Sequence, residues 1–135
     1  MRGVVRFAPR AREQLITHCR SVLPNEACGY LVGDEEHVER FVPVRNAAAS
    51  PSRFVLDVQE QLAAEHAIDA AGETIVGIAH SHPIGDNYPS QIDVEDARRF
   101  DPSGAWVHVV VSPAVGSVRA FRILDGDVEE LSAQP

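Results

Sequence analysis

The sequence predicts one mixed α/β domain in which a single β-sheet is packed by helices. The chain has 135 residues, 44% hydrophobic and 24% charged, an ordinary balance for one globular domain with its own core. Segments with strand-like apolar patterns recur between segments with helical apolar spacing. Strands and helices mixed in this way along a chain are typical of one sheet with helices packed on it. We therefore expect a single domain over residues 1–135.

Short segments typical of strands recur along the whole chain. Residues 38–44 alternate apolar and polar side chains, the period of a half-buried strand, and Pro43 indicates that this strand lies near an edge or ends there. Residues 74–80 are β-branched and apolar, which favours a central strand. Asp125-Gly126 is a strong hairpin signal between two strands. In chain order, the predicted strands are residues 4–7, 28–32, 38–44, 53–56, 74–80, 106–111, 118–124 and 128–131.

Three segments are predicted to be helices. In the first, apolar residues recur at the spacing of a buried stripe, and Pro24 ends the helix. In the second, Asp57 is a good N-cap with Glu60 three residues later, and Gly72 is placed to stop the helix. The third begins at Ser90 and ends before Pro102. The predicted helices are residues 9–22, 58–71 and 90–100.

Composition excludes several classes of protein. The formal net charge of −8 argues against nucleic acid as a partner, because an acidic surface repels phosphates. No segment approaches the ~20 apolar residues that span a bilayer, and residues 1–9 lack a signal-peptide pattern. The two cysteines form no C-x-x-C pattern. We expect a cytoplasmic protein without membrane contact. All twelve basic residues are arginine, so no side-chain amine of this chain can accept an isopeptide-linked modifier.

The segment from His80 to Asp93, HSHPIGDNYPSQID, has the residues of a metal site. Residues two apart on a strand point to the same face, so His80 and His82 can converge on one ion. The third ligand is expected to be a carboxylate or another imidazole, and Asp93 lies in the first turn of the next helix. Three protein ligands that leave a fourth position for water form a catalytic zinc site. Zinc lowers the pKa of such a water to about 7.

Each part of this pattern also has a simpler explanation. An H-x-H pair on a strand is often two histidines on a half-buried face. Ser90-x-x-Asp93 is also a helix capping box, and an aspartate there can cap the helix and bind a metal at once. Taken alone, the H-x-H pair or the Ser90-x-x-Asp93 motif is better explained without a metal. The two motifs together, joined by a turn-rich loop, favour a metal site.

The chain resembles the JAMM/MPN-plus zinc metallopeptidases. H-S-H-P, a loop and then P-S-x-x-D match the signature of this family in identity and spacing. The small prokaryotic members also have a glutamate in a P-x-E-x-C-G segment, and residues 24–29 of this chain, PNEACG, fit it. The resemblance covers nearly the whole chain. It implies the MPN/JAB (cytidine-deaminase-like) fold, with a mixed sheet that is partly barrel-like.

The resemblance also implies a role for each matching residue. His80, His82 and Asp93 would bind one Zn²⁺ per chain, although imidazole and carboxylate ligands accept other divalent ions as well. Glu26 would take the proton of the attacking water and deliver it to the leaving amine. Ser90 would stabilise the oxyanion. Without the resemblance, Glu26 would be an ordinary solvated glutamate near a helix end.

The substrate that the resemblance implies is a ubiquitin-like or sulfur-carrier protein, cut at a peptide or isopeptide bond after its C-terminal Gly-Gly tail. Two alternatives stay open on the sequence alone: a non-catalytic MPN scaffold, and the same zinc chemistry on a cell-wall or other peptide. A cysteine nucleophile has no histidine singled out as its partner. The oligomeric state is not predicted.

Overall fold

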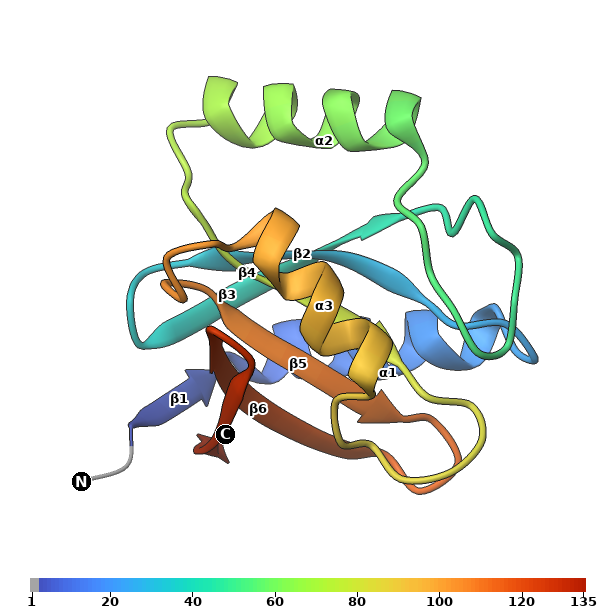
Figure 1. Ribbon diagram of the computed structural model, residues 1–135. Coiled ribbons are helices and arrows are strands. Elements are labelled where there is room, and N and C mark those ends of the chain that lie inside the picture. The colour runs from blue at the N-terminus through green and yellow to red at the C-terminus, as the bar shows by residue number, and fades with distance from the viewer. Residues whose placement is uncertain (1–2) are drawn as a thin grey trace.

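The computed structural model describes residues 3–135, in which seven strands form one mixed sheet that closes into a barrel (Figure 1). The first two positions of the predicted 1–135 domain lie outside the described residues. The strand order around the barrel is β1-β3-β2-β4-β5-β6-β7. The predicted fold class, a mixed α/β fold with a partly barrel-like sheet, is confirmed. The strands are β1 (Val4–Phe7), β2 (Cys28–Gly33), β3 (His37–Val44), β4 (Ile75–Ser81), β5 (Val107–Ser112), β6 (Ser117–Leu124) and β7 (Asp127–Gln134).

The strand register brings two distant parts of the chain together. Strand β2 pairs antiparallel with both β3 and β4, and Cys28 at the start of β2 lies opposite His80 near the end of β4. Strand β5 runs parallel to β4, with Val110 opposite His80. The residues just before β2 and just after β4 therefore meet at one end of the barrel.

The three helices cover different surfaces of this sheet. Helix α1 (Pro9–Ser21) packs Ala11, Leu15 and Cys19 into the main core, together with residues from all seven strands. Helix α2 (Val58–Ala70) lies across the other face of β2, β3 and β4, above the sheet in Figure 1. Helix α3 (Gln91–Phe100) packs on β5 and β6. None of the helices within residues 3–135 is long and apolar enough to cross a membrane.

One predicted strand is wrong. Residues 53–56 contain only an isolated antiparallel bridge between Asn46 and Leu56. The Asn46 side chain replaces strand pairing here, because its oxygen accepts the N–H of Val55 and its amide donates to the Arg53 carbonyl, both at 3.0 Å. Phe54 and Leu56 are buried, so this short apolar segment belongs to the core without being a strand.

Candidate active site

The two histidines of the H-S-H segment point to the same place. His80 is the penultimate residue of β4, and His82 follows the strand directly. Their Nε2 atoms lie 3.2 Å apart. The His80 ring is 5% exposed and stacks on Phe54, with ring centroids 4.7 Å apart. The predicted convergence of the two imidazoles is therefore present, and Phe54 fixes the orientation of one of them.

Asp93 brings a carboxylate to the same place. It occupies the first turn of α3, where it forms a capping box with the N-cap residue Ser90. Its Oδ2 atom lies 3.0 Å from Nε2 of His80 and 3.1 Å from Nε2 of His82, and it accepts the Ser90 N–H at 2.9 Å. Burial alone would raise the pKa of Asp93, but its close contacts with the His80 and His82 rings outweigh burial and hold this pKa far below its usual value. The aspartate both caps the helix and faces the histidines.

The position of the proton on the His82 ring indicates that the cluster can bind a cation. Nδ1 of His82 lies 2.7 Å from the carbonyl oxygen of Asp86. A carbonyl only accepts, so Nδ1 carries a proton, and in a neutral ring Nε2 then presents a lone pair. That lone pair faces the Asp93 carboxylate. Zinc bonds of about 2.0–2.1 Å give tetrahedron edges of roughly 3.3–3.4 Å, close to the 3.0–3.2 Å edges of this triangle.

Glu26, two residues before β2, completes the cluster. Its side chain is 3% exposed, and one of its oxygens lies within 4.8 Å of the ring nitrogens of His80 and His82, a group able to hold a metal ion. Its buried Oε1 has no hydrogen-bond partner within residues 3–135. Burial raises the pKa of Glu26 to about 8, with His82 acting to lower it and Asp93 to raise it. A buried carboxyl with an open hydrogen-bonding position is typical of a catalytic group.

Backbone contacts fix the position of Glu26. The Ala27 N–H donates to Oγ of Ser81 at 2.8 Å, and the Ser81 N–H donates to the Ala27 carbonyl at 3.1 Å. The Glu26 carbonyl accepts the Asn46 amide at 3.0 Å. The serine between the two histidines therefore ties the glutamate segment to the histidine strand. The sequence analysis gave Ser81 and Asn46 no such role, although Ser81 lies in the H-S-H-P motif.

Gly29, in the same segment as Glu26, allows the strands to approach closely. A Cβ atom at this position would overlap the Val42 carbonyl oxygen and the Phe41 ring. No larger residue fits here without moving β3, which explains the glycine that follows Cys28.

Ser90 lies at the mouth of the cluster. It is exposed, and it lines a cavity of about 390 Å³ with Glu26, His82, Ile84 and Tyr88. Its Oγ accepts the Asp93 N–H at 3.1 Å. Because this bond uses an oxygen lone pair, the hydroxyl proton remains available to another acceptor.

The loop between His82 and Ser90 is anchored from beneath. Asn87 is buried, and its amide donates to the Val110 carbonyl at 3.1 Å and to the Ser117 carbonyl at 3.2 Å. Arg119 lies over the Tyr88 ring, 5.6 Å from its centroid, and pairs with Asp86 at 3.2 Å. These contacts hold a turn-rich loop in one position. No pattern in the sequence pairs Asp86 with Arg119, which lies 33 residues away.

Two other titratable residues, His108 and Cys28, have roles outside the cluster. His108 is buried and contacts the Asp101 carboxylate through Nε2 at 3.0 Å, which is a core role. Burial raises the pKa of Cys28 to about 12, and a thiol is a poor nucleophile at neutral pH when its pKa is high. The structure thus gives no support to a cysteine nucleophile.

Comparisons with known proteins identify the class. The family model described as prokaryotic homologs of the JAB domain matches residues 8–124. The chain is 40% identical over 119 residues to the CysO-cysteine peptidase of Mycobacterium tuberculosis, covering 86% of this chain and 80% of that one. It is 35% identical over 133 residues to the desampylase of Haloferax volcanii, covering 93% and 92%. The solution structure of protein DSY2949 from Desulfitobacterium hafniense superposes with a TM-score of 0.83 at 34% identity, covering 96% and 91%.

The chain belongs to the prokaryotic JAB-domain family, as the resemblance to JAMM/MPN-plus proteins predicted. It is an enzyme of the peptidase class, which decides against the alternative of a non-catalytic scaffold. The family and the His/Glu group are both consistent with a bound metal ion.

Proposed function

We propose that the protein is a zinc-dependent peptidase that cuts the bond after the C-terminal Gly-Gly tail of a ubiquitin-like or sulfur-carrier protein. One observation carries the chemical part of this proposal. Three ligand atoms, from His80, His82 and Asp93, lie 3.0–3.2 Å from one another, and the buried carboxylate of Glu26 stands beside them with an oxygen that has no partner in the described chain.

Zinc is the proposed metal, held by His80, His82 and Asp93. Two neutral imidazoles and one carboxylate form a set found in catalytic zinc sites. The Asp86 carbonyl fixes the tautomer of His82 at 2.7 Å, as the outer partners of metal-binding histidines usually do. A bound zinc ion supplies Lewis acidity, which polarises a carbonyl and makes water acidic enough to react near neutral pH.

The residues of this chain then have the following roles. Glu26 accepts the proton of the attacking water and afterwards gives it to the leaving nitrogen. Its pKa, raised to about 8 by burial, suits it to the second step, whereas a bound cation would favour the ionised form needed for the first. The Ser90 hydroxyl donates its free proton to the oxygen of the scissile carbonyl as negative charge develops there. Asn87 and the Asp93 capping box hold these groups in place.

Two relatives support the substrate. One is named for a peptidase that acts on CysO-cysteine and the other as a desampylase, and both match this chain over at least four-fifths of their lengths. A third relative, from Thermus thermophilus, is 32% identical over 126 residues and is named a probable TtuB-protein conjugate cleaving protease. The names of these three relatives are the basis for the carrier protein that we propose as the substrate.

The test is cleavage of a carrier protein fused through its Gly-Gly end to a short reporter peptide. The zinc-loaded wild type should release the reporter, and Glu26→Gln should lose about 10³-fold or more in kcat while it keeps the metal. Glu65→Gln, on α2, is the matched control. Cleavage of a cell-wall peptide by the wild type, with none of the carrier fusion, would contradict the substrate; full activity of Glu26→Gln would contradict the mechanism.

A further inference from the structure

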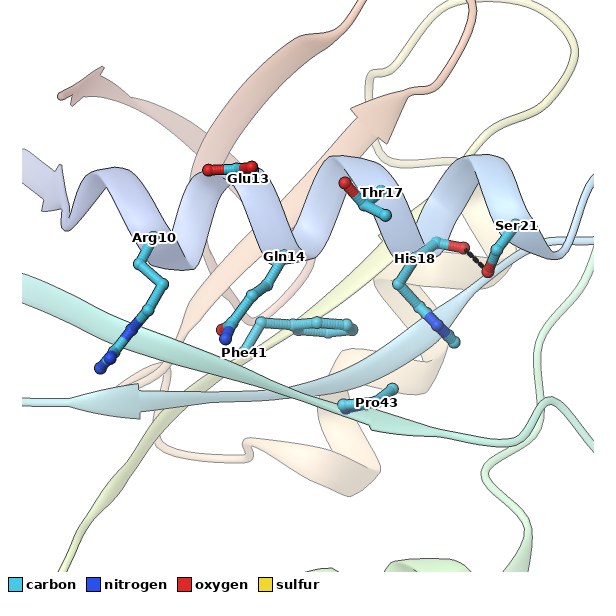
Figure 2. A pocket seen from close by; sticks show the side chains of 8 residues that line it. All are labelled: Arg10, Glu13, Gln14, Thr17, His18, Ser21, Phe41 and Pro43. Atoms are coloured by element: carbon cyan, nitrogen blue, oxygen red, sulfur yellow. Dashed lines mark hydrogen bonds between the residues drawn. The ribbon is translucent and has the colours of Figure 1, made fainter.

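A loop outside the metal cluster contacts two residues of the cluster. This loop, residues 45–57, follows β3, which runs beside α1 (Figure 2), and leads to α2. The Ser50 carbonyl accepts the N–H of Glu26 at 2.8 Å, and the Phe54 ring stacks on His80. The conformation of this loop therefore bears on the position of both residues.

Asn46 organises the loop with four hydrogen bonds. Its Oδ1 accepts the N–H groups of Ala48 and Val55, and its Nδ2 donates to the Arg53 carbonyl, each at 3.0 Å. The fourth bond leaves the loop, because Nδ2 also donates to the Glu26 carbonyl at 3.0 Å. Two accepted and two donated bonds are the full capacity of an amide. One side chain therefore folds the loop and ties it to Glu26.

The turn that presents the Ser50 carbonyl is strained. Ala49 has a φ of 45°, in the left-handed region, which costs a residue with a Cβ atom about 1–2 kcal/mol. The Ala49 N–H donates to the Asn46 carbonyl at 3.1 Å. Strained turns persist only where the surrounding contacts hold them. Without the Asn46 side chain, we expect the turn to relax and the Ser50 carbonyl to move away from Glu26.

Glu26 and Phe54 depend on this loop to different degrees. The Glu26 carboxyl makes no hydrogen bond to residues 3–135, so its position depends on its backbone, whose N–H and carbonyl are both bound by the loop. Phe54 is buried and also stacks on Phe100, with ring centroids 6.2 Å apart. The core therefore holds Phe54 against His80 even when the loop loosens.

We propose that Asn46 is a positioning residue that acts on the reaction through Glu26. This inference rests on the proposed function. A misplacement of roughly 1 Å in an active site can cost about 10²-fold in rate. Loss of the Asn46 amide therefore lowers kcat, while the proposed metal ligands stay in place.

The first test measures cleavage of the carrier fusion by the zinc-loaded protein. Asn46→Ala loses all four bonds, whereas Asn46→Asp keeps an oxygen for the N–H groups of Ala48 and Val55 and loses both donors. Both variants should lose about 10- to 100-fold in kcat and keep the zinc content of the wild type. Asn25→Ala is the matched control and should retain kcat, because the Asn25 side chain precedes Glu26 and makes no hydrogen bond in the described part of the chain.

The second test follows amide hydrogen exchange by NMR, without metal or substrate. The Glu26 N–H should exchange about 10-fold faster in both Asn46 variants than in the wild type. The N–H of Leu31, buried in β2 between β3 and β4, should exchange at the rate of the wild type. Equally faster exchange at both positions would indicate a general loss of stability and would overturn the proposal.

A double-mutant cycle shows whether Asn46 acts through Glu26. In the Glu26→Gln background, Asn46→Ala should lower the residual rate by less than about twofold, because the group that Asn46 positions is already lost. An equal fall in both backgrounds, or unchanged kcat in both Asn46 variants, would overturn the proposal. If the wild type does not cleave the fusion although the Glu26 N–H is loosened as expected, the proposed function is wrong. If the wild type cleaves it and neither variant changes this exchange, only the role of Asn46 is wrong.

Discussion

The two ends of α3 each hold a carboxylate against histidines of the sheet. At the N-terminus, Asp93 faces His80 and His82; at the C-terminus, the C-cap residue Asp101 faces His108. The histidines belong to the neighbouring parallel strands β4 and β5 or follow directly after them, and Ile78, two residues before His80, pairs with His108. The same two residue types thus occur twice, a short distance apart.

The two clusters differ in whether their hydrogen bonds can all be satisfied. Asp101 accepts the N–H groups of Ala105 at 2.9 Å and Trp106 at 3.0 Å, in addition to the His108 ring at 3.0 Å. Every partner is a donor. Burial lowers the pKa of His108, against the opposing effect of Asp101, so the ring is neutral and donates one proton. Asp93 instead faces a His82 lone pair, with an unpartnered Glu26 oxygen nearby. The cluster of Asp101 and His108, here called the closed cluster, stabilises the fold. The cluster of Asp93, His80, His82 and Glu26, here called the open cluster, can bind a ligand.

Asp101→Asn should give the largest change in stability. In the variant, the amide NH₂ group would face a backbone N–H of Ala105 or Trp106, and two donors cannot form a hydrogen bond. Water cannot easily replace the lost bond, because the Asp101 side chain is only 3% exposed. We expect a loss of about 3 kcal/mol in the free energy of unfolding, measured by urea denaturation. The folded variant should still bind one metal ion. A stability within 0.5 kcal/mol of the wild type, roughly the effect of an ordinary surface change, would show that the closed cluster is not a structural clamp.

Ser90→Ala should affect both functions of this residue at the open cluster. Loss of the cap to Asp93 should cost about 1 kcal/mol of stability, and loss of the hydroxyl donor should lower kcat by about 10²-fold. Ser90→Thr keeps the hydroxyl and is the control. If kcat falls equally in both variants, the hydroxyl does not stabilise the oxyanion.

Glu26→Gln should make the protein without metal more stable at neutral pH. Burial raises the pKa of Glu26 in the folded protein to about 8, whereas its pKa in the unfolded chain is roughly 4.3. The contribution of this carboxyl to stability is therefore fully present below about pH 4.3 and is lost as the pH rises toward 8, because the unfolded chain then loses its proton more easily than the folded protein does. In a chelator, the variant should gain about 2 kcal/mol over the wild type at pH 8 and little at pH 4. Thermal unfolding at both values checks this. A wild type that is as stable as the variant at pH 8 would indicate that Glu26 is not strained by burial.

Much of the open cluster could be predicted from the sequence, because its residues lie close together in the chain. The H-x-H spacing on a strand and the Ser90-x-x-Asp93 cap dictate where three side chains point, and the structure brings them together. Glu26 lies 54 residues from His80 in sequence. Its burial depends on the register of β2 against β4, which no local pattern encodes, so only the resemblance to a family singled it out.

No local pattern predicts the closed cluster or the strand pairing that closes the barrel, and only the resemblance implied a partly barrel-like sheet. Asp101 binds N–H groups of a turn, and nothing in its local pattern distinguishes it from a surface aspartate. The parallel pairing of β1 with β7 joins the two ends of the chain. The predicted strand at residues 53–56 is wrong because Phe54 and Leu56 are buried in a short apolar segment whose backbone groups bind the Asn46 side chain instead of a neighbouring strand.

The central claim is that the open cluster binds zinc and the closed one does not. Metal content of the purified protein, measured by mass spectrometry without added metal, tests it most directly. The account predicts about one zinc per chain in the wild type and in His108→Gln, and none in His82→Ala. Absence of zinc from the wild type, with no uptake when zinc is added, would contradict it, and so would full zinc content in His82→Ala.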